Sequence, residues 1–561
     1  MHTDTTEFVR RTREVTETRA WPRLLELGLY AFASFAGSLA YALFVLAHTV
    51  PNVFWDQWEQ AKLIIASFTH TLTFSNLWSQ HNLNRMLIPN IIEVIYAHLL
   101  RSEAFPAVVT ALVLYTGSYL ALIMFILRHS SGLSRLFAFL SASALMLSTI
   151  FEEDSLWSFQ LAWFIVIVCL ILAGIAAASC KPKVALPLVI GLSLIATFSS
   201  LQGIIVLPAI ALIFLANRNW RATPILLTIW TSELALYFHG LNLSNTGGPG
   251  ISATFHSPIL AAKYFLVIVG SIFGSIGLGP LGFRPVELAG LLLIILALTA
   301  IMIATRWFLD GRAIPALSLI GASLFAYGLV FAAMTTVGRT GFGLAEAESS
   351  RYTLNTLFIP VGTALVLAGL IQQSEQAVKY LQAISGVLLG LTLIAASIGD
   401  PVMLTQADLF HQEMLRSIAL TANWESAPSA EVSTLVYPNV QVFKIRAAQL
   451  QRFQLDGFGG AVFSFLRLEG PTPAVPSTRP LGLPLKHPLP KFYAAWDTLS
   501  AVYFQRSDLQ SAFPLGMPVN RRDCVLAKWA TRSAQGGSDS SRTLLRPFAQ
   551  TFQEMQSMLC K

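Results

Sequence analysis

Apolar residues dominate the chain from residue 24 to about residue 400, in long stretches separated by short polar segments. A helix that crosses a bilayer needs about 17–25 mostly apolar residues. The stretches that meet or approach this length are 24–47, 105–127, 133–150, 159–178, 184–200, 203–217, 222–239, 286–305, 313–333, 354–372 and 380–398. They predict an all-α polytopic membrane bundle of about 11–13 transmembrane helices, within residues 24–399.

Two further segments are ambiguous by hydropathy. Residues 86–100 are short and contain Glu93 and His98, and residues 263–280 are rich in glycine and serine. If neither crosses, both are interfacial or re-entrant elements on the outer side, and about 11 spans place the C-terminus outside. If both cross, the count rises to about 13.

Basic residues mark one side of the predicted membrane domain. Residues 1–23 are rich in arginine, and lysine or arginine recurs in alternate short loops. These loop residues are Arg128, Arg135, Lys181, Lys183, Arg218, Arg221, Arg306 and Arg312. The positive-inside rule therefore predicts a cytoplasmic N-terminus, with the first apolar stretch retained as an anchor.

The composition excludes a soluble enzyme. Of the 561 residues, 12% are charged and 54% are hydrophobic, and soluble domains carry roughly twice that charged fraction. In so apolar a chain, the net charge of +7 fits membrane topology better than a nucleic-acid surface. No nucleic-acid partner is expected.

Residues 400–561 contain no stretch long and apolar enough to cross a membrane. Their length, about 160 residues, suffices for a separate core, so we expect a C-terminal extracytoplasmic α/β domain. Cys524 and Cys560 both lie in this domain, where oxidation is permitted. A disulfide between them is compatible with the sequence, although spacing does not establish one.

The predicted first outer loop, residues 48–104, begins with an acidic and aromatic motif. Asp56 lies between two tryptophans in FWDQWEQ, with Glu59 three residues later. A carboxylate held just above the bilayer is partly desolvated, which raises its basicity and suits it to deprotonate an acceptor hydroxyl. An aromatic belt with a solvated acid explains the same residues. Either Asp56 or Glu59 is a candidate base.

Later in this loop, the sequence SQHNLNRMLIP places His81 and Arg85 four residues apart. If the stretch is helical, both side chains share one face, and the planar guanidinium of Arg85 suits a phosphate. A helix cap with ordinary interface anchors is the alternative.

Three consecutive acids, Glu152, Glu153 and Asp154, form a second candidate site between two predicted spans. Adjacent carboxylates repel one another, so a cation or hydrogen-bonding partner is expected nearby. A divalent cation shared with Asp56 or Glu59 would explain them, and so would simple solvation.

A third polar cluster, residues 335–355, contains Arg339, Arg351 and Tyr352. Arg351 begins a predicted membrane helix from the outer side, which is a good position for binding a lipid phosphate. The GRTGFG stretch has no preceding strand and no Walker lysine, which argues against a nucleotide-binding loop.

Together these features resemble the integral-membrane glycosyltransferases of the GT-C fold. Asp56 in FWDQWE matches the position of the family's first-loop acid, and residues 152–154 fall where many members have a second acid. The resemblance covers about residues 20–400 and extends to the C-terminal domain by position only. Unlike many members, the chain lacks paired adjacent acids in the first loop.

The resemblance implies a polyprenyl-phosphate-linked sugar as donor, such as arabinofuranose or mannose. It also implies an extracytoplasmic acceptor, which would be an envelope glycan or a surface protein such as pilin, and a bacterial cytoplasmic membrane. Inverting transfer would use Asp56 as base and Arg85, Arg339 or Arg351 to hold the phosphate, with His81 donating to it.

Two other functions compete with this prediction. A lipid-linked sugar flippase would need polar residues near the bilayer midplane, and the predicted spans are almost free of charge. A polysaccharide ligase would use a long outer loop between two late spans, and residues 335–355 are short for that role.

Overall fold

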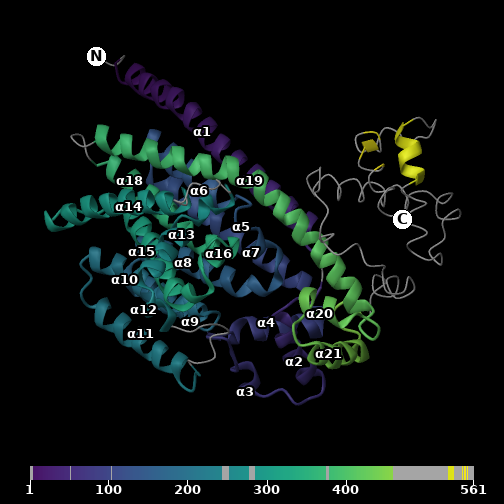
Figure 1. Ribbon diagram of the computed structural model, residues 1–561. Coiled ribbons are helices and arrows are strands. Elements are labelled where there is room, and N and C mark those ends of the chain that lie inside the picture. Colours follow the sequence, from purple (N-terminus) through teal and green to yellow (C-terminus); the bar gives the residue numbers. More distant parts are fainter. Residues whose placement is uncertain are drawn as a thin grey trace. The chain divides into compact units, whose positions relative to one another are not determined.

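The computed structural model describes residues 4–50, 52–102, 104–242, 252–276, 285–373, 378–458 and 528–535, together with 546, 549, 550 and 553. The chain divides into two compact units, and many of their helices are labelled in Figure 1. The first contains Met1–Thr49 and Thr69–Ala407, and the second contains Val50–Phe68 and Asp408–Lys561. The second unit therefore combines a short piece of the predicted first outer loop with the C-terminal part of the chain.

The first unit is built almost entirely from helices. Its α-helices are α1 (Asp4–His48), α3 (Phe74–Leu77), α4 (Leu87–Leu100), α5 (Ala104–His129), α6 (Gly132–Met146), α7 (Glu152–Leu156), α8 (Leu161–Ser179), α9 (Pro182–Thr197), α10 (Val206–Ala216), α11 (Ala222–Phe238), α12 (Ser252–His256), α13 (Pro258–Val269), α14 (Pro285–Leu309), α15 (Ala316–Arg339), α16 (Leu344–Ala347), α17 (Thr353–Thr356), α18 (Phe358–Ile371) and most of α19 (Val378–Ala422).

Short 3-10 turns and one hairpin connect these helices. The turns are η1 (Ser158–Gln160), η2 (Leu201–Ile205), η3 (Ser271–Ile276), η4 (Thr340–Phe342) and η5 (Ser350–Tyr352). The hairpin pairs β1 (Gln80–His81) with β2 (Asn84–Arg85) in antiparallel register. The second unit contains the end of α19 with α2 (Gln57–Phe68), α20 (Ser429–Leu435) and α21 (Val440–Phe453).

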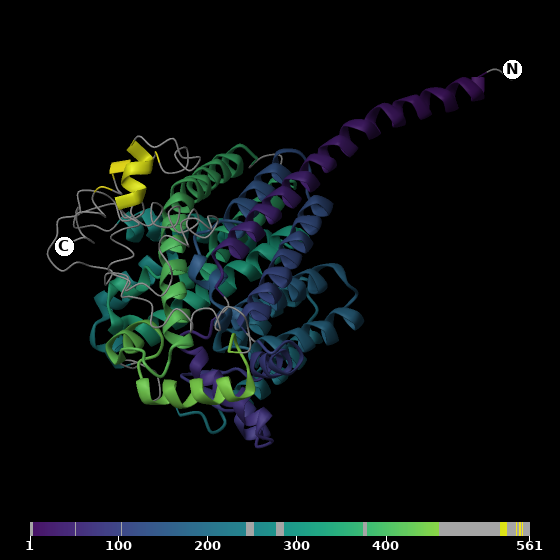
Figure 2. The same cartoon turned by 90° about the vertical axis from the view of Figure 1, so that its right-hand side faces the viewer.

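Every apolar stretch that the sequence predicts as a span is helical over most of its length in the structure. Among the described residues, seven helices are long and apolar enough to cross a membrane: Leu25–His48, Ala104–His129, Ser158–Ser179, Pro285–Leu309, Ala316–Phe342, Ser350–Ile371 and Lys379–Ala422. Six shorter apolar helices accompany them, including α4 and α13 at the two ambiguous segments. The all-α polytopic character is thus confirmed, and α1 runs as one continuous helix (Figure 2).

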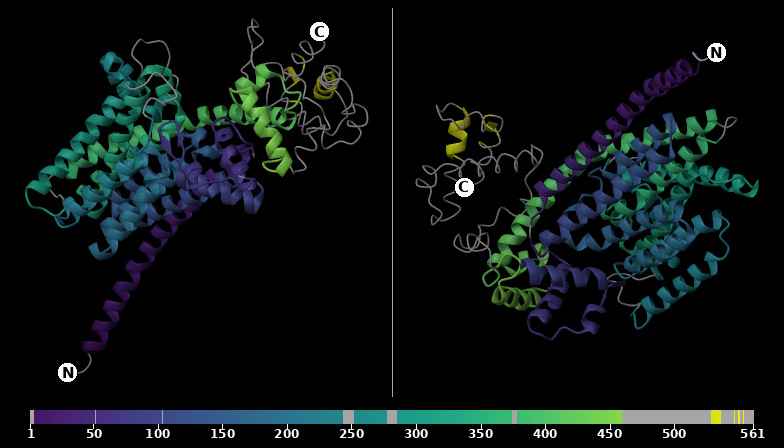
Figure 3. Two further views of the ribbon diagram at one scale, coloured as in Figure 1. Left: turned by 90° about the horizontal axis from the view of Figure 1, so that it is seen from below. Right: turned by 180° about the vertical axis from the view of Figure 1, so that it is seen from behind.

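The core of the first unit lies between α15 and α18, which pack against each other. The blue and teal helices of this unit lie side by side (Figure 3). Of the most apolar 18-residue window of Ser350–Ile371, 94% is buried, against 22% for the window in Pro285–Leu309. Glycine permits the close approach, because a Cβ on Gly321 would lie 2.5 Å from the carbonyl oxygen of Gly362. This helix pair holds the ends of α15 and α18, and the polar segment between them, in place.

The predicted boundary at 399/400 lies inside α19, which continues through Pro401 to Ala422. Of the predicted C-terminal domain, the described residues up to 458 and those at 528–535 are mainly helical. Residues 459–527 and most of 536–561, including Cys524 and Cys560, lie outside the described residues.

Candidate functional site

The acids of α7 lie beside the segment that leads into α18, both within the first unit. The hydroxyl of Ser350 donates to Oε1 of Glu152 at 3.0 Å, and that of Ser349 donates to Oε2 of Glu153 at 3.1 Å. Nη1 of Arg351 lies 3.8 Å from Oε1 of Glu153. The structure therefore brings Glu153 and Arg351 together from two separate sequence clusters.

Arg351 has a second carboxylate partner, Glu346, in the short helix α16. One oxygen of Glu346, Oε1, accepts hydrogen bonds from Nη2 of Arg351 and from the hydroxyl of Tyr352, the latter at 2.8 Å. The guanidinium carbon of Arg351 also lies 5.4 Å from the centroid of the Tyr352 ring, within the range of a cation–π interaction. Arg351 and Tyr352 thus form one cationic and hydrogen-bonding surface, which Glu346 covers.

Arg339, the last residue of α15, contributes a second cation to the same region. Its guanidinium carbon lies 5.2 Å from the centroid of the Phe342 ring. Its charge interacts with both Tyr352 and Tyr264 of α13. Arg339 forms no ion pair with any carboxylate in the described part of the chain.

Asp154 is enclosed by the helices around α7. Only 1% of the residue is exposed, and neither carboxyl oxygen has a hydrogen-bond partner among the described residues. The hydroxyl of Tyr115, from α5, is equally buried and unpaired, and it is close enough to interact with Asp154 electrostatically. These polar groups lie in an apolar setting that does not satisfy them.

Burial determines the protonation of two of the three α7 acids. It raises the pKa of Glu152 to about 8, with the Glu153 charge adding to the shift and the Ser350 hydrogen bond opposing it. Burial also raises the pKa of Asp154 well above its ordinary value, again with a contribution from Glu153 and against the charge of Arg351. A carboxyl group removed from water favours its neutral form, so burial shifts both acids toward protonation, and the pKa of about 8 leaves Glu152 mainly protonated at pH 7.

The stretch containing His81 and Arg85 is a β-hairpin, so the predicted helical arrangement of these two side chains is wrong. Gln80 pairs with Arg85 and His81 pairs with Asn84, and Asn82 in the turn has a φ of 50°. Asparagine tolerates this left-handed conformation, which reverses the chain. The hairpin is fixed to η2 by Asn84, whose Oδ1 accepts from Ser200 Oγ and Leu201 N, both at 3.0 Å.

Arg85 is 5% exposed, and its guanidinium binds backbone carbonyl groups. It donates to the carbonyl oxygens of Trp78 and His239, both at 2.7 Å, and of Tyr237 at 3.3 Å. Arg85 therefore ties the hairpin to the end of α11. His81 contacts the ring of Phe159, with 5.2 Å between centroids, so it borders η1.

In the second unit, Asp56 and Glu59 lie at the start of α2. Trp55 has a φ of 47° and donates its backbone N–H to the carbonyl oxygen of Val436 at 3.0 Å. Asp56 follows in the same turn, half-buried, directly before the first residue of α2. The edge-to-face contact of Trp58 with Phe443, at 4.9 Å between centroids, packs α2 against α21.

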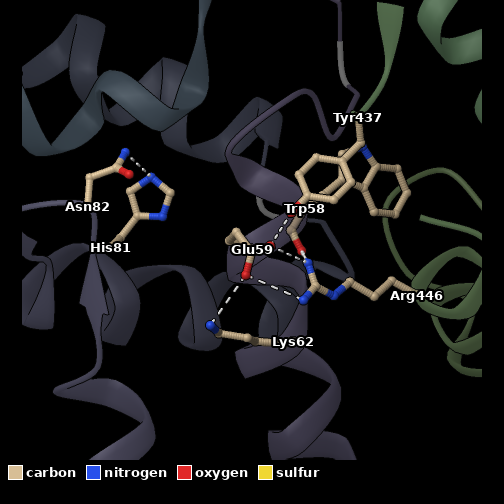
Figure 4. A network of polar contacts seen from close by, with 7 residues as sticks. All are labelled: Trp58, Glu59, Lys62, His81, Asn82, Tyr437 and Arg446. Atoms are coloured by element: carbon tan, nitrogen blue, oxygen red, sulfur yellow. Dashed lines mark hydrogen bonds and ion pairs between the residues drawn. The ribbon is translucent and has the colours of Figure 1, made fainter. Parts of the chain in front are cut away.

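Glu59 is held by three side chains (Figure 4). Arg446 donates to both of its carboxylate oxygens, at 3.1 and 3.4 Å, while the Tyr437 hydroxyl donates to Oε1 and Lys62 lies 3.4 Å from Oε2. Burial alone would raise the pKa of Glu59, but the hydrogen bonds from Tyr437 and Arg446 and the nearby positive charges lower it to about 2. Arg446 also donates to the Trp58 carbonyl oxygen, which fixes its guanidinium.

Sequence reasoning missed several of these residues. Glu346 belongs to a recognised polar cluster but has no assigned role there, and its spacing of five residues from Arg351 is the signal that could have linked them. Tyr437 and Arg446 lie nearly 400 residues from Glu59 in the chain, and no local pattern connects them. The candidate divalent cation has no matching group, since no three His, Cys, Asp or Glu residues in the described ranges are placed to hold a metal ion.

Comparison with known proteins finds no matching family model, no similar curated protein and no similar solved structure.

Proposed function

We propose that this chain is a membrane glycosyltransferase. It moves a sugar, arabinofuranose or mannose in the simplest case, from a polyprenyl-phosphate donor to an extracytoplasmic glycan or protein acceptor. The apolar helices support a membrane setting, and the motifs that resemble the GT-C family support the reaction. The proposal includes a bacterial cytoplasmic membrane, a cytoplasmic N-terminus and a C-terminal domain on the outer side.

The difference between the two first-loop acids supports a specific base. Glu59 accepts hydrogen bonds from Tyr437 and Arg446, and its pKa of about 2 makes it a weak base. A general base works best when its pKa lies nearer the working pH. Glu59 is thus occupied by its ion-pair network, and this is the observation that leaves Asp56, half-buried in the turn before α2, as the proposed base.

In the proposed reaction, an acceptor hydroxyl attacks the anomeric carbon of the donor sugar with inversion. Asp56 takes the proton from that hydroxyl while the bond between the anomeric carbon and the phosphate oxygen breaks. The phosphate leaves on its lipid carrier with an added negative charge. Within the first unit, Arg351, Tyr352 and Arg339 are the groups that we propose to bind a phosphate, because fixed cations and donors stabilise negative charge. Arg85 is not assigned this role, since its guanidinium binds three carbonyl groups.

The test is sugar transfer by the purified full-length protein in detergent, with a panel of polyprenyl-phosphate sugars and glycan or protein acceptors. Asp56→Asn keeps the size of the side chain and removes its basicity, so turnover should fall by at least about 100-fold. Thermal stability and donor binding should remain close to those of the wild type.

Glu425→Gln is the matched control, because it removes one exposed acid from the same unit and should leave turnover unchanged. Full turnover by Asp56→Asn would remove Asp56 from the mechanism. Absence of transfer with every donor, combined with lipid movement in liposomes, would replace the transferase with a flippase.

A further inference from the structure

Glu346 makes the contacts that a phosphate oxygen would make. Its Oε1 accepts from both Nη2 of Arg351 and the hydroxyl of Tyr352. Arginine binds carboxylate and phosphate through the same planar set of N–H donors. A carboxylate of the chain itself thus occupies the position to which Arg351 and Tyr352 both donate.

The carboxylate does not use all the donors that are present. Nε of Arg351 is buried and has no acceptor among the described residues. A phosphate that approaches the guanidinium side-on accepts from Nε and Nη together, whereas Glu346 accepts from Nη2. Arg339 adds a nearby cation that no described carboxylate neutralises. Nη1 of Arg351 lies 3.8 Å from Glu153, so the buried Nε of Arg351 and the side chain of Arg339 are the groups that remain to bind a further anion.

The side chain of Glu346 can move away from Arg351 and Tyr352 without any movement of the long helices. It lies on α16, a helix of four residues, and its side chain is 23% exposed. The preceding Gly343 has a φ of 86°, and no neighbouring atom lies within 4 Å of a Cβ built on it. By contrast, the hydrogen bonds of Glu152 and Glu153 hold Ser350 and Ser349, so the segment that bears Arg351 stays anchored.

We propose that Glu346 is a built-in competitor for a phosphate ester carried on a lipid. In the unliganded protein it holds Arg351 and Tyr352 in the geometry for an oxyanion, and on binding the phosphate displaces it toward solvent. The identity of the lipid as the sugar donor rests on the function proposed above. The competition itself requires only the anionic phosphate group.

The experiment measures binding of a polyprenyl monophosphate to the full-length protein in detergent, with inorganic phosphate and the corresponding polyprenol as separate ligands. Glu346→Gln removes the competing charge and should bind the lipid phosphate about tenfold more tightly, which corresponds to about 1.4 kcal/mol. Glu348→Gln removes the same charge two residues away and should leave affinity unchanged. The double variant Arg351→Met/Glu346→Gln should lose the tighter binding of the lipid phosphate that Glu346→Gln shows alone.

The three ligands distinguish the sources of the phosphate. Tightening for the polyprenyl phosphate, without tightening for polyprenol, is the expected result. Inorganic phosphate that binds as tightly as the polyprenyl phosphate would overturn the lipid-borne part of the proposal, because the lipid would then add nothing to the affinity. Unchanged or weaker binding of the lipid phosphate by Glu346→Gln would overturn the competition and make Glu346 a positioning residue for Arg351.

A second variant guards against a loss of folding in Glu346→Gln. Glu346→Asp keeps the charge but shortens its reach by one methylene, so it should tighten binding by a smaller factor, roughly twofold to fourfold. Weaker binding by this variant would also contradict the proposal. If both variants tighten phosphate binding while no sugar is transferred, the competition stands and the glycosyltransferase proposal fails.

Discussion

Glu59 and Glu152 are glutamates with hydrogen-bond partners, yet their pKa values lie on opposite sides of the ordinary value of 4.5. Arg446, Tyr437 and Lys62 surround Glu59 and hold its pKa at about 2. Glu152 receives one side-chain hydrogen bond, from Ser350, and burial raises its pKa to about 8. At Glu59, the hydrogen bonds from Tyr437 and Arg446 and the charges of Arg446 and Lys62 together outweigh desolvation. At Glu152 no cation contributes, and desolvation prevails over its hydrogen bonds.

This contrast separates two kinds of acidic cluster. The Glu59 cluster is an ion-pair network that joins α2 to α20–α21 within the second unit. In the α7 cluster, burial raises the pKa values of Glu152 and Asp154, and Glu153 lies beside Arg351. The first is suited to holding structure together, and the second limits the negative charge near the proposed phosphate site.

The largest expected effect is a pH dependence that Glu152 imposes on stability. Since its pKa is raised in the folded state, the folded protein retains a proton that the unfolded chain loses. Stability therefore falls as pH rises from about 4.5 to 8, by at most about 5 kcal/mol. Glu152→Gln can still accept from Ser350 but does not titrate, so its melting temperature in detergent should decline less over this range.

Glu59→Gln is the control for that measurement. The pKa of Glu59 is lowered, so its stabilisation is present above about pH 4.5 and is lost as pH falls toward 2. Glu59→Gln should leave the change in melting temperature between pH 5 and pH 8 the same as in the wild type. If the melting temperature falls equally with pH in Glu152→Gln and in the wild type, Glu152 is ionised in the folded protein over this range.

A smaller effect is expected from removing the cation at Glu59. Arg446→Met keeps an unbranched apolar stem but leaves Glu59 without its guanidinium partner and the Trp58 carbonyl without its donor. Removing one partner of a buried pair costs about 3–5 kcal/mol, and we expect about 2 kcal/mol here because Glu59 is 30% exposed. The readout is thermal unfolding at pH 7.

Lys62→Met is the matched variant for this comparison, because it removes a cation from the same carboxylate. The Lys62 side chain is 46% exposed, and exposed ion pairs contribute about 0–1 kcal/mol. If Lys62→Met loses as much stability as Arg446→Met, the assignment of Arg446 as the main partner of Glu59 is contradicted.

The smallest effect is expected at Asp154. If the residue is neutral and accepts no hydrogen bonds, Asp154→Asn replaces one uncharged group with another of the same shape. Stability at pH 7 should change by less than about 1 kcal/mol, measured by thermal unfolding. A loss of about 3 kcal/mol or more would mean that Asp154 is ionised and paired with Arg351.

Hydropathy located the helices well because each span carries its own signal. The stretches 105–127 and 286–305 correspond to α5 and α14 within a few residues. The end of α19 was missed, since residues 399–422 mix polar and apolar positions and include Pro401. Pairing at the hairpin was also missed, because a four-residue spacing fits a helix equally well and Asn82 alone marks the turn.

The sequence by itself determined that this is an all-α membrane bundle, and it identified the polar clusters that contain Asp56, Glu153 and Arg351. Transfer of apolar residues from water to lipid is a sum over short segments, so local composition is sufficient to predict it. The tertiary structure alone decided which acids are charged and which side chains they bind. Those properties depend on burial and on partners such as Arg446 for Glu59 and Ser350 for Glu152, which folding brings together from distant parts of the chain.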